Sequence, residues 1–255
     1  MDVFLDHERV AARDDLRVVD ARDGWEFDGI GHIPGAVSVP FDEFRAEDGD
    51  EGMLPGAERW AGLLSAAGVA ADDSILAYDD THGVFAARFL VTALAYGHDP
   101  EQLFLLDGDY SAWSRERPVS RTATEPTTTD YEPREPETDP FVDYETVRAA
   151  VDGDALLVDT REPEEYDAGH LPGAVQLDWR ELVDTDGSRG LYPRDRLETT
   201  LADHGIDRDR RIVLYCNTAR RISHTYLVLR HLSYDRVAFY EGSLTEWERR
   251  GGPVE

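Results

Sequence analysis

The chain has 255 residues, and its 54 acidic residues against 26 basic ones leave a formal net charge of −28. All the basic residues are arginine, and the acidic residues are spread over the whole chain, which disfavours nucleic acid and anionic membranes as partners. A single cysteine excludes an intrachain disulfide, no apolar run reaches membrane-spanning length, and the N-terminus lacks the features of a signal peptide. We therefore expect a cytoplasmic protein.

Short apolar strands alternate with stretches of helical periodicity along the chain. In chain order, buried strands are predicted at residues 16–19, 75–78, 155–158 and 211–215, where β-branched and apolar residues predominate. This alternation is typical of βα units on a parallel sheet. We predict an α/β fold in which a central parallel sheet is flanked by helices.

The chain also repeats itself once. Four segments of the first half return in the same order in the second half, at an offset of 134–139 residues. The matched pairs are residues 16–22 with 155–161, 31–37 with 169–175, 75–79 with 212–216, and 108–113 with 242–247. A period of this length indicates a duplicated domain, and each copy is long enough to bury its own core.

A segment rich in proline, threonine and glutamate separates the two copies. Its composition cannot bury a core and favours an extended linker. We predict a first domain at residues 1–118, a linker at 119–138 and a second domain at 139–255. The second domain is expected to open with a helix at 139–152.

Cys216 directly follows the predicted strand 211–215 and precedes a stretch of helical periodicity that begins at Ile222. Open α/β sheets bind ligands beyond the carboxyl ends of their strands, where the N–H groups of a loop entering a helix converge. Arg220 and Arg221 add positive charge, and together these features favour the nucleophilic thiolate. The alternative is a cysteine that serves as a small buried hydrophobic residue, but that role does not require two neighbouring arginines.

The position equivalent to Cys216 in the first half is Asp79, which is followed by Asp80, Thr81 and His82 instead of arginines. A carboxylate cannot act as a sulfur nucleophile, so we predict an inactive, structural first domain. A separate catalytic or metal site at Asp79 and His82 is the alternative. His and acidic residues do not stand at convincing metal spacing in the sequence, and we predict no metal.

The repeated segments together resemble the two-domain rhodanese family, the thiosulfate and 3-mercaptopyruvate sulfurtransferases. The resemblance covers nearly the whole chain. It rests on an Asp-x-Arg after the first strand of each half, two Gly-His-(Ile/Leu)-Pro-Gly-Ala segments, the cysteine loop and a closing Gly…Trp segment. It implies two tandem rhodanese-like domains. It also implies that sulfane sulfur is transferred through a persulfide on the second domain, and that no cofactor is needed.

The resemblance also implies roles for individual residues of the second half. Cys216 corresponds to the nucleophile that forms the persulfide. Asp159 and Arg161 correspond to a salt bridge that supports the loop, and a direct part in catalysis is the alternative. The donor-binding residues that the resemblance implies are Asn217, Thr218, Ala219, Arg220 and Arg221.

Departures from the family pattern bear on the sulfur donor. The segment 162–168 is short and acidic where tandem rhodaneses usually carry a further donor-binding arginine. The segment 217–219 lacks the glycines and serine usual in the mercaptopyruvate enzymes. Both departures favour thiosulfate or a persulfide as the donor, with cyanide or a thiol, including a protein thiol, as the acceptor. A 3-mercaptopyruvate sulfurtransferase and a persulfide carrier without turnover are the alternatives.

A cysteine-dependent phosphatase is a further alternative of a different reaction class. Such enzymes place five residues between the cysteine and the arginine of the loop, whereas four residues separate Cys216 from Arg221. With five intervening residues, the position of the phosphatase arginine is occupied by Ile222, which cannot bind an oxyanion. The spacing therefore favours a sulfur atom over a phosphoryl group.

The acidic, lysine-free composition resembles that of proteins from salt-loving archaea. Their cytoplasm is rich in potassium chloride, which screens the self-repulsion of such a surface. We therefore expect a halophilic source.

Overall fold

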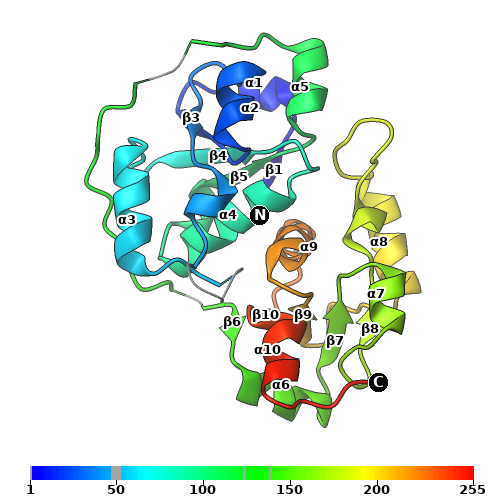
Figure 1. The fold of residues 1–255 in the computed structure, drawn as a ribbon. Coiled ribbons are helices and arrows are strands. Elements are labelled where there is room, and N and C mark those ends of the chain that lie inside the picture. Colours follow the sequence, from blue (N-terminus) through cyan, green and yellow to red (C-terminus); the bar gives the residue numbers. More distant parts are fainter. Residues whose placement is uncertain (1, 47–52, 123–124, 138) are drawn as a thin grey trace. The chain divides into compact units, whose positions relative to one another are not determined.

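The computed structural model describes residues 2–46, 53–122, 125–137 and 139–255 (Figure 1). The chain divides into two compact bodies. The first comprises Asp2–Asp139 with Thr185–Gly190, and the second comprises Pro140–Asp184 with Leu191–Glu255. Residues 123, 124 and 138 of the predicted linker lie outside the described residues.

The first body contains a five-stranded sheet in the order β1-β5-β4-β2-β3, and every pair of neighbours is parallel. Its strands are β1 (Phe4–Leu5), β2 (Leu16–Asp20), β3 (Val37–Ser38), β4 (Ser74–Tyr78) and β5 (Leu103–Leu106). Its helices are α1 (His7–Ala11), α2 (Gly24–Gly29), α3 (Ala57–Ala66), α4 (Val84–Ala95) and α5 (Tyr110–Glu116), with short 3-10 helices η1 (Phe41–Glu43) and η2 (Pro100–Gln102).

The second body repeats this arrangement in the order β6-β10-β9-β7-β8, again with parallel neighbours. Its strands are β6 (Phe141–Val142), β7 (Leu156–Asp159), β8 (Val175–Gln176), β9 (Ile212–Tyr215) and β10 (Val237–Tyr240). Its helices are α6 (Tyr144–Val151), α7 (Pro163–Asp167), α8 (Arg194–Asp203), α9 (Arg220–His231) and α10 (Ser243–Arg249), with the 3-10 helix η3 (Trp179–Leu182). The predicted α/β class is confirmed in both halves.

The strands β7 and β9 are buried because helices cover both faces of the sheet, with α9 on one side and α6 and α10 on the other (Figure 1). Side chains alternate between the faces of a strand. Val213 and Tyr215 of β9 share one core cluster with Trp247 of α10. On β10, Phe239 packs its ring against Tyr226 of α9, with 6.1 Å between centroids. The sheet thus packs against helices on both faces.

The start of the second body differs from the helix predicted at 139–152. The helix α6 begins only at Tyr144 because the Asp143 side chain caps it by accepting the Thr146 N–H at 2.9 Å. Before the cap, β6 pairs with β10, and Phe141 packs against Phe239. A capping aspartate therefore divides the segment into an edge strand and a helix.

The described residues 125–137 belong to the first body and run beside it in an extended conformation (Figure 1). Tyr131 is buried there and its N–H donates to Ser65 Oγ at 2.9 Å. The N–H of Arg134 donates to the Tyr96 C=O at 2.8 Å. Single residues of this proline-rich segment are therefore anchored although the segment forms no core of its own.

Candidate active site

Cys216 lies at the carboxyl end of β9, the central strand of the second sheet. Its backbone is held from α10: the Cys216 N–H donates to Ser243 Oγ at 3.1 Å, and its C=O accepts the Leu244 N–H at 2.9 Å. The residue is 1% exposed. The segment that follows β10 therefore fixes the position of the cysteine.

Residues 217–219 turn the chain from β9 into α9. Ala219 has a φ of 65°, in the left-handed region that costs free energy for a residue with a Cβ. The Ser223 hydroxyl donates to the Ala219 C=O at 2.8 Å, and the Thr245 hydroxyl donates to the Asn217 C=O at 2.9 Å. These contacts hold the strained turn from α9 and from α10. Thr218, predicted to bind the donor, is half-buried in it.

Arg221, which was predicted to bind the donor, contacts Glu165 of α7. Arg221 Nη2 donates to Glu165 Oε1 at 2.9 Å, Nη1 donates to Oε2, and Asn217 Nδ2 donates to Oε1 at 2.7 Å. The hydrogen bonds from Arg221 hold the pKa of Glu165 at about 2, so this carboxylate is charged at neutral pH. Burial opposes the charge of Arg221, but Glu165 and the nearby Cys216 raise its pKa above the usual value. The neighbouring Arg220 is exposed.

Asp159 and Arg161 form a buried ion pair behind the loop. Arg161 Nε lies 2.9 Å from Asp159 Oδ1 and 3.0 Å from Oδ2. The same guanidinium donates to the Gly169 C=O at 2.7 Å and to Asn217 Oδ1 at 3.4 Å. The ion pair therefore connects β7 with the loop that carries Cys216.

The first half has the same ion pair. Arg22 Nε lies 2.9 Å from Asp20 Oδ1, and Arg22 Nη2 donates to the Gly31 C=O at 2.7 Å. Because the pair also occurs beside Asp79, where no cysteine is present, it belongs to the fold of each half. Its support of the cysteine loop remains a prediction.

The loop equivalent to 216–223 in the first half surrounds a carboxylate. Asp79 follows β4, is 1% exposed, and accepts four backbone hydrogen bonds of 2.7–3.0 Å. The N–H donors belong to Thr81, Gly83, Phe85 and Ala86. Burial raises the pKa of Asp79, and the four N–H groups act in the opposite direction by stabilising its charge. The loop is therefore a cradle of backbone N–H groups filled by its own side chain.

The two loops agree in part of their backbone conformation. His82, at the position equivalent to Ala219, has a φ of 55° and lies in the same left-handed region. Each loop leads directly into a long helix, α4 or α9. The loops differ at the next residue, where Gly83 has a φ of 86° while the equivalent Arg220 is already the first residue of α9. They also differ at the start, where Asp79 carries a carboxylate and Cys216 a thiol.

Glu165 and Ser243 were not predicted from the sequence. Glu165 belongs to a capping box with Glu162, whose spacing of three residues is a recognisable sequence signal for a helix start. That signal places Glu165 in the first turn of α7 but does not reveal its partner Arg221. Ser243 has a φ of 50°, and its hydroxyl donates to the Tyr240 C=O at 2.9 Å while it accepts from Cys216.

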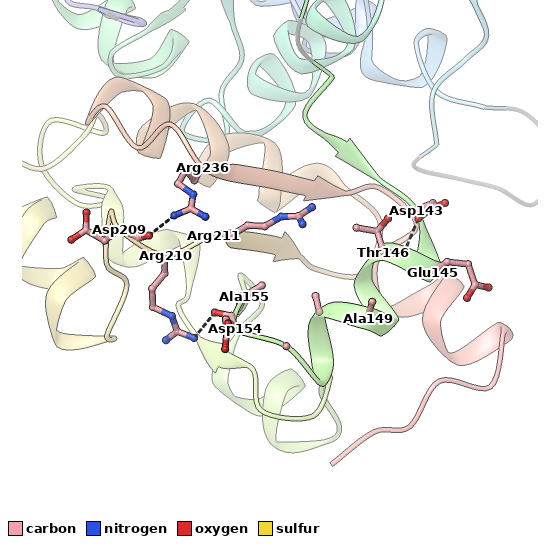
Figure 2. A pocket seen from close by; sticks show the side chains of 12 residues that line it. Asp143, Glu145, Thr146, Ala149, Asp154, Ala155, Asp209, Arg210, Arg211 and Arg236 are labelled. Atoms are coloured by element: carbon pink, nitrogen blue, oxygen red, sulfur yellow. Dashed lines mark hydrogen bonds between the residues drawn. The ribbon is translucent and has the colours of Figure 1, made fainter.

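A hollow of about 840 Å³ is lined in part by Arg210 and Arg211 (Figure 2). These residues precede β9, so the hollow lies at the opposite end of this strand from Cys216. Arg210 and Arg236 extend along it, and each donates to a backbone C=O, that of Asp154 at 3.3 Å and that of Asp209 at 2.7 Å. The hollow is lined by other residues than those of the cysteine loop. It is therefore a separate feature of the second body.

Neither a metal site nor a membrane-spanning helix is present within the described residues. Among them, no group of three or more His, Cys, Asp or Glu side chains has the arrangement of a metal site. None of the helices in these parts of the chain is both long enough and apolar enough to cross a membrane.

The fold and the site define a tandem α/β protein in which one domain carries a buried cysteine on the loop between a central strand and a helix. The family model of the rhodanese-like domain matches residues 6–116 and 143–250, which is most of the chain. The chain therefore belongs to the rhodanese family of sulfurtransferases, as the resemblance predicted.

Relatives match over most of their length. The thiosulfate sulfurtransferase of Corynebacterium glutamicum is 30% identical over 261 residues, which cover 91% of this chain and 82% of the relative. A protein of Haloferax volcanii, provisionally named a thiosulfate sulfurtransferase, is 31% identical over 250 residues and covers 88% of this chain and 83% of its own.

Solved structures show the same fold. The 3-mercaptopyruvate sulfotransferase SseA of Escherichia coli superposes with a TM-score of 0.84 at 23% identity, over 95% of this chain and 99% of SseA. YnjE superposes with a TM-score of 0.81 at 23% identity, and this chain spans 62% of the YnjE chain. At this identity the likeness concerns the fold alone.

Proposed function

We propose that the chain is a thiosulfate sulfurtransferase that carries sulfane sulfur as a persulfide on Cys216. The position of Cys216, at the start of the loop equivalent to the Asp79 cradle, carries the proposal. In the first half this loop gathers four N–H groups around the Asp79 carboxylate, and in the second half the same position holds the chain's single cysteine. The equivalent N–H groups would stabilise a thiolate and then the terminal sulfur of a persulfide.

The reaction consists of two displacements at sulfur. The Cys216 thiolate attacks the outer sulfur of thiosulfate, so that an Sγ–S bond forms, the S–S bond of thiosulfate breaks, and sulfite leaves with the electron pair. A thiophilic acceptor such as cyanide then attacks the terminal sulfur of the persulfide, which yields thiocyanate and regenerates the thiolate. Because Cys216 is buried, the donor has to present a narrow terminal atom, which the outer sulfur of thiosulfate provides.

The setting of the reaction is part of the same proposal. The name of the Corynebacterium glutamicum relative supports thiosulfate as the donor, and the acceptor would be cyanide, a small thiol or a protein thiol. A net charge of −28 without lysine supports action in a salt-rich cytoplasm, away from nucleic acid and anionic membranes.

Intact-mass spectrometry tests the donor and the carrier state together. After incubation with thiosulfate and removal of excess donor, the protein should gain the mass of one sulfur atom, and addition of cyanide should remove it. The same gain with 3-mercaptopyruvate but not with thiosulfate would contradict the proposal in favour of the mercaptopyruvate alternative. A persulfide that forms without steady-state production of thiocyanate would support the carrier alternative.

The variant Cys216→Ser tests the nucleophile. A serine hydroxyl is almost wholly un-ionised near neutral pH and cannot hold a persulfide, so thiocyanate production should fall to background while the melting temperature stays close to that of the parent. Retention of more than a few per cent of the activity would rule out Cys216 as the sulfur carrier.

A further inference from the structure

Glu165 is the acidic side chain that faces the cysteine loop from α7. Its carboxylate accepts hydrogen bonds from both terminal nitrogens of Arg221 and from Asn217 Nδ2. A guanidinium that donates two parallel hydrogen bonds to a carboxylate forms the strongest kind of polar pair in proteins. The positive charge predicted to receive the donor is therefore already engaged by an anion of the protein itself.

The pair lies where a donor can reach it. The Arg221 side chain is 20% exposed and that of Glu165 is 32% exposed, so neither is sealed in the core. Arg221 is also close enough to Cys216 for the two to interact electrostatically. A small dianion that approaches Cys216 would meet Arg221 and Glu165 together, with one charge attracting it and the other repelling it.

The first half shows that the glutamate is part of the fold whereas the ion pair is not. Glu26 occupies the same third position of a capping box in α2, but the residue equivalent to Arg221 is Val84. There burial raises the pKa of the carboxyl, whereas the pKa of Glu165 is lowered by Arg221. The Glu165–Arg221 pair therefore occurs in the half that carries the cysteine loop, and the fold of a rhodanese-like domain does not require it.

We propose that Glu165 is an internal competitor for the sulfur donor, and that it sets how tightly the site holds donors that carry negative charge beside the transferred sulfur. The inference rests on the proposed function. A thiosulfate ion has to take hydrogen-bond donors of Arg221 away from Glu165, so Glu165 weakens donor binding. Glu165 is a specificity-determining residue that acts through Arg221 and does not touch the reacting sulfur atoms.

The variant Glu165→Gln tests the proposal because it removes the charge and keeps the shape. The one carbonyl oxygen of glutamine can still accept from Asn217 at the position of Oε1, while the Glu162 N–H loses its acceptor Oε2. The KM for thiosulfate should fall roughly three- to tenfold, as expected for release of a partly exposed ion pair, while kcat changes little. Glu164→Gln is the matched control because Glu164 is the exposed neighbour of Glu165 in the same helix, and its KM should stay at the parent value.

A second measurement does not depend on turnover. Cys216 is alkylated with the neutral reagent iodoacetamide in the presence of increasing sodium sulfate, and the half-protecting concentration is determined. Glu165→Gln should lower this concentration by the same factor as the KM. An unchanged half-protecting concentration would overturn the role of Glu165 even if thiosulfate is a good substrate. If the parent protein does not use thiosulfate, a lowered concentration still supports the role.

A double variant separates competition from a general loosening of the loop. In an Arg221→Ala background Glu165 has no guanidinium to compete for, so the gain from Glu165→Gln should shrink to less than about twofold. A gain that persists undiminished without Arg221 would overturn the proposal.

Discussion

Arg221 shares its charge between two neighbours, the carboxylate of Glu165 and the sulfur of Cys216. Replacement of Arg221 by Ala removes the cation and leaves the Glu165 carboxylate uncompensated beside the loop. We expect Cys216 to react more slowly with iodoacetamide and the kcat/KM for thiosulfate to fall roughly tenfold to a hundredfold, the range for loss of a charge-assisted hydrogen bond. Arg221→Lys keeps the charge without the bidentate geometry and should lie in between. Equal rates of Cys216 alkylation across pH in the parent, Arg221→Ala and Arg221→Lys proteins would contradict an effect of the Arg221 charge on Cys216.

The low pKa of Glu165 gives a second prediction at the same scale. Its folded-state pKa of about 2 lies below the usual 4.5, so the pair stabilises the fold above pH 4.5 and loses this effect as the pH falls from 4.5 toward 2. Glu165→Gln resembles the protonated carboxyl. Urea unfolding should show the variant less stable by about 1–2 kcal/mol at pH 6, after allowance for solvent screening, and the difference should shrink at pH 3. A difference that grows at acid pH would refute the assignment.

At the scale of elements, the start of α4 depends on Asp79. Its carboxylate accepts four N–H groups of the loop, and loss of an acceptor from a buried site leaves these donors without partners. Asp79→Ala should lower the free energy of unfolding of the first body by about 3 kcal/mol or more. Asp79→Asn should lower this free energy by a smaller amount. Iodoacetamide labelling of Cys216 should not change in the native protein. Unfolding monitored by tryptophan fluorescence measures the effect, and an unaffected stability would mean that the cradle contributes little.

The sequence predicted long-range features better than short elements. The repeat placed β2, β4, β7 and β9 correctly because each contains at least three apolar residues in a short segment that recurs in the other half. The edge strands β1 and β6 have two residues each, which is too short for any periodicity to show. Although its role as the nucleophile stays a prediction, Cys216 was selected for the candidate active site by its place after a strand. The Glu165–Arg221 pair was not, because its members lie 56 positions apart and meet only through the fold.

At the scale of the whole molecule, both bodies carry their own parallel sheet, and the net charge of −28 is distributed over both. Folding concentrates this charge, so self-repulsion opposes the compact state in dilute buffer. The absence of lysine leaves arginine as the one permanent cation, and many arginines are engaged in local ion pairs such as Arg13–Asp15 and Arg194–Glu198. Most of the acidic excess therefore has to be screened by solvent ions.

Potassium chloride should accordingly stabilise the protein. The Debye length falls to about 3 Å at 1 M salt, which screens most repulsion between surface carboxylates, so the melting temperature should rise steadily between dilute buffer and about 2 M salt. Salt also screens the attraction of Arg220 and Arg221 for thiosulfate, and the KM for thiosulfate should therefore rise over the same range. Differential scanning calorimetry and steady-state kinetics on the same samples measure the two effects. A melting temperature that stays flat or falls would refute the expectation of a halophilic protein and would leave the role of Cys216 untouched.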